Sequence, residues 1–556
     1  MPLSDSVKKV FYHAHTSVPV RTRSGIVINR RTFYIAVTLS ILCPLLFVCL
    51  LLVAAQRRRD AEPATRPRQV STASSTVTVK RGGNLQAAID KAHYGDVIVL
   101  EAGATYTGPI ILPFKESKAG SEEYITITTS NPKGVPSENE RVNPEVHASA
   151  MPKIVSPNSS VAIGTAERAH HYKFVGLEFS PAADSQYVYN LIDLGKSEYK
   201  SLSQFPDHLI FDRCYVHSTG LNKARRGFAL NSGDTTITNS YISGFAGKED
   251  ETQGIGGWNG PGPFHIVNNY IEGGAQNIMF GGADPAVPNL VPANIEIRRN
   301  FLYKPLEWFG HTTIKAVIEL KNARHVVIDG NVLECAGLTG TFVLTVRNQS
   351  GTAPWSILED INVTNNIVHH SAAGFSILGR DSDHPSEQAK RIRIANNLIV
   401  DVGPDYAAAF IAGCCGDTVT VENNTVQQTG TIMLCYGPPS SNFIFRNNIV
   451  QYNAYGVNCP SNALSPGSRG NIIADNQGAI SANGFPPVIP SGNFVVNSYD
   501  QVGFIDYVHG DWRLAAQSKV KGRGSDKKDP GVDFDALAAA VSPSDVEAPY
   551  FGKKKR

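Results

Sequence analysis

The sequence has few of the features that mark a metal site or a nucleic-acid site. It contains only 8 Cys among 556 residues, too few for a disulfide-dense scaffold, and none of its Cys/His spacings is typical of zinc. A formal net charge of +2 provides no basic field, so no nucleic-acid partner is predicted. What remains is a long chain with 49 Gly, 42% hydrophobic and 18% charged residues, which favours one long domain with appendages.

A polar anchor residue with apolar flanks recurs nine times between residues 209 and 450. The anchors are Cys214, Ser240, Asn269, Asn300, Asn331, Asn366, Asn397, Asn424 and Asn448. The positions three before and two after each anchor are all apolar, which is the alternation of a strand on either side of a corner. A period of 24–35 residues is typical of repeats that bury their apolar faces on one another. The pattern predicts an all-β fold, a right-handed parallel β-helix.

The alternative solenoid is a leucine-rich-repeat horseshoe, which has a similar period. That fold needs a Leu-dominated consensus and little variation in repeat length. Here Ile and Val dominate and the spacing varies by eleven residues, which a β-helix tolerates because insertions leave at its corners. Asn tolerates left-handed turns and can form amide ladders between stacked coils, so we interpret the Asn anchors as structural.

The chain divides into five predicted segments. Residues 1–32 are polar and basic and predict a disordered tail, and residues 33–55 are uncharged and long enough to cross a bilayer as one transmembrane helix. A cleaved signal peptide is the alternative for that stretch. Residues 56–76 predict a linker, residues 77–515 the β-helix and residues 516–556 a C-terminal tail.

The apolar segment also carries a prediction about location. Arginines flank it on both sides, so the positive-inside rule does not fix its orientation. We expect a single-pass membrane protein with the β-helix outside the cytoplasm, because a binder of surface polymers is useful only there. We expect the protein to be a monomer.

An N-terminal cap carries a resemblance to a known superfamily. Residues 77–100 predict a strand, a short helix capped by Asn84 with Leu85 and Ile89 on its apolar face, and a Gly-Asp-Val-Ile strand. This cap and the Asn-anchored coils resemble the pectate-lyase-like superfamily of right-handed β-helix proteins over roughly residues 77–515. The superfamily includes lyases, hydrolases, epimerases and binding proteins, so the resemblance implies the fold more than an activity.

Charged residues are expected to gather on one outer face of the coils. In the strand that contains Ile318 and Leu320, these two side chains point inward while Glu319 and Lys321 point outward. Arg347 points outward from the strand of the next coil, about 4.8 Å away. Glu319, Lys321 and Arg347 therefore form the densest predicted cluster, with a surface ion-pair ladder as the alternative.

Polymers of uronic acids suit such a face. A lyase removes the proton beside the uronate carboxyl and expels the glycosidic oxygen, which requires a base, an acid and a positive charge on the carboxylate. Resemblance to the chondroitinase B and alginate lyase family implies Lys321 as base, Arg347 as acid or carboxylate clamp and Glu319 as orienting partner. That family has a second acidic metal ligand and a longer spacing before its Lys, and this chain departs from it in both, so no metal ligand is assigned. Calcium is kept only as an alternative cofactor.

Five further residues are candidates for binding the substrate. Trp258 can stack on a sugar ring and Asn259 can bond its hydroxyls, since both lie in a Gly-rich protruding turn. Asp284, Arg380 and Asp381 are expected at the edge of the charged face. The leading hypothesis is a membrane-anchored protein that acts on an acidic polysaccharide by β-elimination. The alternative is a non-catalytic β-helix that binds glycans or scaffolds the envelope.

Two smaller patterns leave alternatives open. Cys415, Cys435 and Cys459 lie 20 and 24 residues apart, about one coil each, so two of them can stack within disulfide reach or all can be buried thiols. The pairs 170–171 and 369–370 are both His-His, and we interpret them as coil-surface residues rather than metal ligands.

Overall fold

The computed structural model describes residues 20–21, 27–28 and 74–545, apart from 117–122, 336–339, 404–407, 414–415, 454–455, 461, 465–467, 477–490 and 543–544. The chain splits into two compact units, Met1–Ala73 and Ser74–Arg556. In the first, the described part is the antiparallel pair β1 (Val20–Arg21) and β2 (Val27–Ile28). The predicted transmembrane helix at 33–55 lies outside the described residues. Among the residues that are described, no helix is long and apolar enough to cross a membrane.

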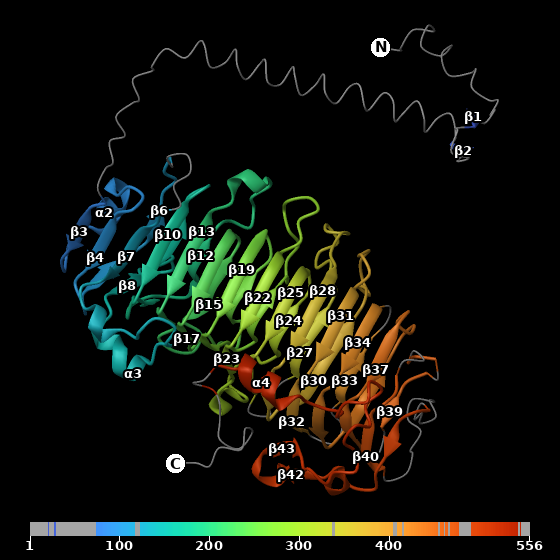
Figure 1. Cartoon of the computed structure of the whole chain (residues 1–556). Coiled ribbons are helices and arrows are strands. Elements are labelled where there is room, and N and C mark those ends of the chain that lie inside the picture. Colours follow the sequence, from blue (N-terminus) through green and yellow to red (C-terminus); the bar gives the residue numbers. More distant parts are fainter. Residues whose placement is uncertain are drawn as a thin grey trace. The chain divides into compact units, whose positions relative to one another are not determined.

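The second unit is a stack of coils whose strands form three parallel sheets, here called the first, second and third sheets (Figure 1). The first sheet contains β3 (Thr76–Val79), β4 (Val97–Leu100), β7 (Ile125–Thr129), β10 (His170–Val175), β13 (Asp207–Asp212), β16 (Gly233–Thr238), β19 (Gly262–Val267), β22 (Ala293–Arg298), β25 (Ala323–Asp329), β28 (Leu358–Thr364), β31 (Lys390–Ala395), β34 (Asp417–Glu422) and β37 (Phe443–Arg446). The second sheet contains β5 (Thr105–Thr107), β8 (Lys153–Ser156), β11 (Glu178–Pro181), β14 (Tyr215–His217), β17 (Tyr241–Ser243), β20 (Tyr270–Glu272), β23 (Phe301–Tyr303), β26 (Val332–Glu334), β29 (Ile367–His369), β32 (Leu398–Val402), β35 (Thr425–Gln428), β38 (Ile449–Asn453), β40 (Ile472–Asn476) and β41 (Phe494–Val495).

The third sheet carries the charged residues that the sequence singles out. It contains β6 (Ile110–Leu112), β9 (Ile163–Thr165), β12 (Val188–Leu194), β15 (Ala224–Leu230), β18 (Gln253–Gly257), β21 (Gln276–Phe280), β24 (Ala316–Leu320), β27 (Gly340–Thr345), β30 (Ala373–Leu378), β33 (Ala408–Ala412), β36 (Thr431–Cys435) and β39 (Val457–Asn458). The helices are short: α2 (Leu85–Lys91), α3 (Pro144–His147), α4 (Phe534–Ala540) and the 3-10 turns η1 (Pro132–Gly134), η2 (Ala148–Ala150), η3 (Leu202–Gln204), η4 (Leu306–Trp308), η5 (Tyr499–Val502) and η6 (Tyr507–His509). The predicted all-β solenoid is confirmed.

The predicted inward positions form the core between the sheets. Phe211 and Ile237, three before their anchors, are fully buried, as is Val216, two after an anchor. In the third sheet, Phe342 and Phe375 stack in adjacent coils with ring centroids 4.5 Å apart. Each coil thus buries its apolar side chains mainly on its neighbours, as the repeat pattern predicts.

The anchors occupy the corner between the first and second sheets, where their amides form a ladder. From Asn269 to Asn493, each Asn Nδ2 donates to the Oδ1 of the Asn in the next coil, at 2.8–3.1 Å. The left-handed conformation belongs to the residue before each anchor, for example Asn268 (φ 55°) and Asn365 (φ 54°), rather than to the anchor itself. Both polar atoms of the anchor side chain, Oδ1 and Nδ2, therefore form hydrogen bonds with neighbouring coils.

The N-terminal end of the coil stack is covered, and a disulfide links two coils near the other end. The cap predicted at the N-terminal end is present: Asn84 Oδ1 accepts a hydrogen bond from the Ala87 amide, and Leu85 and Ile89 of α2 are buried. Near the other end, Cys435 and Cys459 form a disulfide between coils, one of the two alternatives for these cysteines. Cys415 lies outside the described residues.

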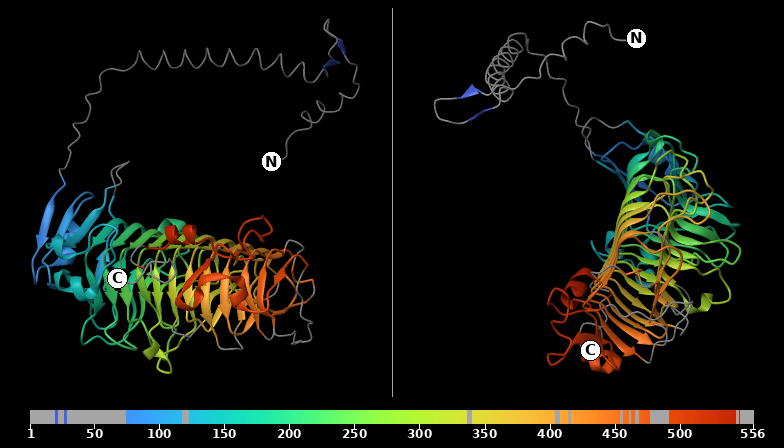
Figure 2. Two further views of the ribbon diagram at one scale, coloured as in Figure 1. Left: turned by 60° about the horizontal axis from the view of Figure 1, so that its bottom comes forward. Right: turned by 90° about the vertical axis from the view of Figure 1, so that its right-hand side faces the viewer.

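The C-terminal boundary differs from the one predicted at residue 515. The last paired strand of the coils is β41, and β42 (Phe504–Asp506) and β43 (Asp511–Leu514) form an antiparallel hairpin outside the stack (Figure 2). Trp512 and Leu537 join a second apolar cluster with Ile367 of the second sheet. Residues 516–542 are therefore not a free tail, because apolar side chains on both sides of the predicted boundary cover the outside of the second sheet.

Candidate functional site

The outer face of the third sheet carries a row of polar side chains that link four coils. Arg226 Nε donates to Gln253 Oε1 (2.7 Å), and Gln253 Nε2 donates to Gln276 Oε1 (2.9 Å). Gln276 Nε2 then donates to Glu319 Oε2 (2.6 Å), whose other oxygen lies 3.5 Å from Lys321 Nζ. We call these five residues the polar ladder. Four of its members, Arg226, Gln253, Gln276 and Glu319, are buried, so their polar groups are held in place by hydrogen bonds rather than by water.

Local sequence explains why Glu319 faces outward. Phe228, Ile255, Ile278 and Ile318 are Cα partners in successive coils, and their side chains fill the core. The residue after Ile318 therefore points away from the core, which puts Glu319 on the outer face. The same alternation does not account for Arg226, Gln253 and Gln276, which precede inward-facing residues by two positions.

One end of the ladder is aromatic. The Arg226 guanidinium lies 4.9 Å from the Trp258 ring centroid and 5.3 Å from that of Tyr189, and Arg225 lies 4.6 Å from the Tyr189 ring. Tyr189 is 52% exposed. Burial lowers the pKa of Arg226, and the neighbouring Arg225 lowers it further. An exposed ring beside two cations is an arrangement that suits a sugar bearing a carboxylate.

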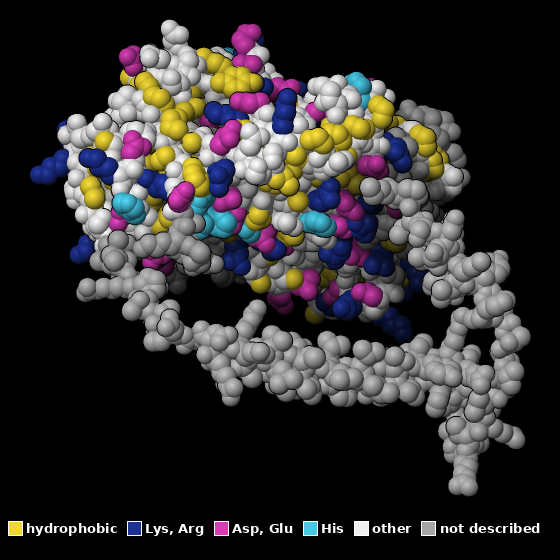
Figure 3. Space-filling view, turned by 90° about the horizontal axis from the view of Figure 1, so that it is seen from above, with side chains coloured by type: hydrophobic (Ala, Val, Ile, Leu, Met, Phe, Trp, Pro, Cys, Tyr) yellow, Lys and Arg dark blue, Asp and Glu magenta, His cyan; other side chains and the backbone are white. Residues whose placement is uncertain are grey.

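A second ion pair flanks the centre of the ladder. Glu251 accepts hydrogen bonds from Lys315 Nζ and from Gln276 Nε2, the latter at 3.5 Å. Burial raises the pKa of Glu251, but the hydrogen bonds from Lys315 and Gln276 outweigh it, and the net pKa is lowered. Beside it, Tyr187 donates to Asp250 at the edge of a cavity of about 230 Å³. The face of the molecule seen in the space-filling view carries acidic and basic side chains side by side (Figure 3).

Comparison with known proteins agrees with this architecture. The family model described as "Right handed beta helix region" matches residues 316–495. The chain is a right-handed parallel β-helix protein. The right-handed β-helix fold that the resemblance implies is thereby confirmed. No curated protein sequence matches the chain.

Solved structures similar to this β-helix protein include several enzymes. An alginate lyase from Paenibacillus sp. str. FPU-7 is 14% identical, with 67% of this chain and 98% of that chain covered and a TM-score of 0.33. The catalytic unit of a thermostable GH87 α-1,3-glucanase from Streptomyces thermodiastaticus strain HF3-3 is 14% identical, with 76% and 73% covered and a TM-score of 0.46. A mannuronic-acid-specific polysaccharide family 6 lyase from human gut microbiota is 14% identical, with 75% and 92% covered and a TM-score of 0.37. These similarities concern the fold alone.

Of the three predicted catalytic residues, the structure brings two together. Glu319 and Lys321 lie 3.5 Å apart, and the Lys321 side chain is 16% exposed. Arg347 follows in the next coil, where its backbone N–H donates to the Lys321 carbonyl (3.0 Å). Its guanidinium is directed instead at Asp381 (2.9 Å) and Asp383 (3.4 Å).

The predicted substrate-binding residues have different environments. Trp258 lies against Arg226 at the aromatic end of the ladder. Asn259 is fully buried and bonds backbone groups on both sides: its Nδ2 donates to the carbonyl of Tyr199, and its Oδ1 accepts from the amide of Ala286. That geometry makes Asn259 a support for the turn beneath Trp258.

The three remaining candidates hold loops at the edge of the face. Asp284 Oδ2 accepts from the amides of Ser350 and Thr352, and Arg380 donates to the Ser386 carbonyl. Asp381 has a 1% exposed side chain. Burial raises the pKa of Asp381, but backbone hydrogen bonds and Arg347 outweigh this, so its net pKa is lowered.

The donors around Glu319 test the calcium alternative. One carboxylate oxygen of Glu319 accepts from the Gln276 amide and the other faces the Lys321 ammonium. A calcium ion requires several oxygen ligands, whereas this carboxylate is surrounded by N–H groups. The polar ladder therefore does not fit calcium, and the described groups of three or more metal-type ligands lie away from it.

Sequence reasoning missed Arg226, Gln253 and Gln276. They lie 12, 13 and 7 residues after their respective anchors, because the turn between the second and third sheets varies in length. No fixed offset from the anchors could align them. Each of them also precedes an inward-facing residue by two positions, so strand alternation alone would predict an inward side chain.

Proposed function

We propose that the outer face of the third sheet binds an acidic polysaccharide and that Lys321, with Glu319 and Arg347, cleaves it by β-elimination. The observation that carries this proposal is the continuity of the polar ladder, from the aromatic end at Tyr189 to the Lys321 ammonium. Four coil steps separate β12 from β24, roughly 19 Å at the spacing of parallel strands. A face of that length suits a chain of sugars rather than a single one.

Each charged group has a role in the proposed reaction. Lys321 Nζ, in its amine form, removes the proton beside the uronate carboxyl, and Glu319 orients it from 3.5 Å. A C=C bond forms as the bond to the glycosidic oxygen breaks, and the Lys321 ammonium so formed gives a proton to that oxygen. A guanidinium pairs with the uronate carboxylate, so that the negative charge that develops there is stabilised. Arg347 reaches that role by exchanging its contact with Asp383, whose side chain is 71% exposed, while Asp381 continues to hold it.

A second candidate function is binding without cleavage. The observation in its favour is that Arg347 is already matched by Asp381 and that both oxygens of Glu319 have partners. In this case the polar ladder is a rigid recognition surface, and only Trp258, Tyr189 and the two arginines contact the glycan.

The proposed location follows from the N-terminal sequence. Residues 33–55 anchor the protein in a membrane, and the β-helix lies outside the cytoplasm, where polysaccharides are found. The length and lack of charge of this segment support the proposal.

Incubation of the purified protein with alginate, pectate and glycosaminoglycans tests the two functions. Cleavage by β-elimination creates unsaturated products that absorb in the ultraviolet. We expect product with the parent and with Lys173→Ala, a half-buried lysine of the first sheet, and none with Lys321→Ala. Binding of a polymer without product by folded parent protein would favour the second candidate, and neither binding nor product would exclude both.

A further inference from the structure

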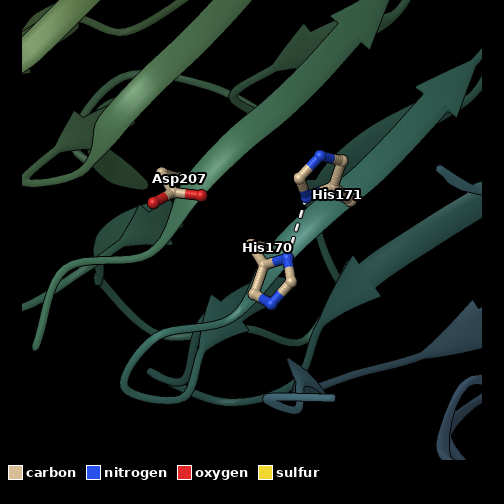
Figure 4. Close-up of side chains that lie close together, drawn as sticks. All are labelled: His170, His171 and Asp207. Atoms are coloured by element: carbon tan, nitrogen blue, oxygen red, sulfur yellow. Dashed lines mark hydrogen bonds between the residues drawn. The ribbon is translucent and has the colours of Figure 1, made fainter. Parts of the chain in front are cut away.

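The His-His pair at residues 170–171 has a geometry that a regular strand does not produce. Neighbouring side chains of a strand point to opposite faces. His171 has a φ of 58°, in the left-handed region, and both imidazoles lie on the same side of β10. Their Nδ1 atoms are 2.8 Å apart (Figure 4).

The next coil adds a carboxylate to this pair. Asp207 of β13 is the Cα partner of His170, and the ligand atoms of His170, His171 and Asp207 all lie within 4.8 Å of one another. His208, with a φ of 49°, turns toward the same side, and its Nδ1 lies 2.7 Å from Asp207 Oδ1. Its ring stacks on that of His171 with centroids 4.3 Å apart.

Tyr94 is a hydrogen-bond partner of His170. The Tyr94 hydroxyl donates to the Lys115 carbonyl (3.0 Å), and its oxygen lies 3.2 Å from Nδ1 and 3.1 Å from Nε2 of His170. In the tautomer with the proton on Nε2, this oxygen accepts from Nε2–H, and the lone pair of Nδ1 faces His171. Metal-binding histidines commonly have such a partner on the other ring nitrogen.

We propose that His170, His171 and Asp207 bind a divalent transition-metal ion of the Zn²⁺ type. Two imidazole nitrogens and a carboxylate oxygen are ligands that zinc accepts, and three protein ligands leave a coordination position open. Bonds of about 2.1 Å at tetrahedral angles place ligand atoms about 3.4 Å apart. The 2.8 Å separation and the 4.8 Å limit bracket that value, so small rotations of the side chains suffice.

Metal binding requires both imidazoles to present the lone pair of Nδ1. The proton between His170 Nδ1 and His171 Nδ1 in the hydrogen-bonded pair therefore moves to the Nε2 of the ring that carries it. His208 continues to donate to Asp207 and holds the carboxylate toward the ion. His170 and His171 of one coil and Asp207 of the next thereby bind one ion, and Tyr94 contacts His170 from outside the ligand set.

The second His-His pair, at residues 369–370, has a different arrangement. His369 Nδ1 and His370 Nδ1 both face the carboxylate of Glu334, at 3.4 and 2.8 Å, and His370 Nε2 faces Asp401 at 3.2 Å. The nitrogens of these imidazoles face carboxylate oxygens, which accept hydrogen bonds from them. The proposal is therefore confined to the cluster at His170.

Equilibrium dialysis of the untagged full chain against Zn²⁺ tests the site. Asn tolerates the left-handed conformation, so His171→Asn removes the imidazole and keeps the backbone. His325→Asn is the matched control, because His325 also has a positive φ (53°) near the start of its strand but faces Asp360 without a second histidine. We expect His171→Asn to bind one equivalent of Zn²⁺ fewer than the parent, and His325→Asn to bind as many.

Two results overturn the proposal. One is a parent that binds no Zn²⁺, and the other is an equal number of equivalents in the parent and His171→Asn. If circular dichroism shows that His171→Asn does not fold, Asp207→Asn decides the question by the same count, with one equivalent lost expected and none lost overturning the site.

Discussion

Replacement of Asn366 by alanine tests the reasoning about the Asn ladder. Asn366 is fully buried, and its Oδ1 accepts from the backbone N–H and the Nδ2 of Asn331, at 3.0 and 2.9 Å. Its Nδ2 donates to the carbonyls of Ile328 (3.0 Å) and Thr364 (2.9 Å) and to Asn397 Oδ1 (2.9 Å). Alanine removes all five bonds from a corner that water does not reach.

The expected cost follows from the groups left without a partner. The Asn331 N–H loses its acceptor, and such an orphaned buried donor costs about 1–3 kcal/mol. The Ile328 carbonyl and Asn397 Oδ1 each lose one donor, which adds roughly 1 kcal/mol. We therefore expect Asn366→Ala to lower the free energy of unfolding by about 2–4 kcal/mol.

Asn362→Ala is the control, because Asn362 lies on the same strand, β28, and is only half-buried. A substitution there is expected to change stability by less than about 0.5 kcal/mol. Repeat arrays can unfold in more than one step, so urea midpoints are combined with hydrogen exchange of the Asn331 amide. That amide should exchange roughly 5- to 150-fold faster in Asn366→Ala. Equal midpoints and equal exchange in the two variants would refute the ladder as a source of stability.

Three further predictions concern the polar face and the end of the coil stack. Trp258→Ala should weaken binding of an acidic polysaccharide about fivefold, as measured by calorimetry, because it removes an aromatic surface worth about 1 kcal/mol. Asp381→Asn should reduce the loss of unfolding free energy on acidification. Because the pKa of Asp381 is lowered in the folded state, its contribution to stability is complete above the unfolded pKa of about 3.9 and is lost as pH falls through the folded pKa. Urea unfolding at pH 3 and pH 6 checks this, and an equal acid loss in parent and variant would contradict it. Cys459→Ser should cost about 3 kcal/mol, because it opens a 24-residue loop closed by the disulfide with Cys435, and a denaturation midpoint equal to that of the parent would contradict it.

Much of the fold could be predicted because the coils repeat local physics. The apolar residues at fixed offsets from the anchors, such as Ile237 and Val216, are buried as their alternation requires. The amide ladder could be predicted from Asn at coil spacing, but which residue of each corner takes the left-handed conformation could not. The left-handed residue is Asn268 or Asn365 rather than the anchor itself, and both positions are Asn in the sequence.

The C-terminal segment could not be placed, because its partners are distant in the sequence. The position after each anchor faces outward, and in several later coils it is aliphatic, as at Val332, Ile367 and Leu398. These residues pack against Trp512 and Leu537 of the segment that covers them. An apolar outward row indicates that something covers it, but the repeat pattern does not say which segment does.

Only part of the candidate site could be predicted, because alternation relates residues of one strand but not residues of different coils. Glu319 and Lys321 belong to one strand, so alternation alone puts them on one face. The other members of the polar ladder come from strands whose distances from the anchor differ, and only the register shows that Arg226, Gln253 and Gln276 are neighbours.

The two chemical clusters are built in the same way, from single residues of adjacent coils. Gln276 and Glu319 are 43 residues apart in sequence and bonded at 2.6 Å. His170 and Asp207 are 37 residues apart and share one register row. Because stacking fixes the coil spacing at about 4.8 Å, one substitution in a neighbouring coil can add or remove a ligand without disturbing the core. The chemistry of this β-helix therefore depends on rows of equivalent positions across coils, and variants that change one row should leave the others intact.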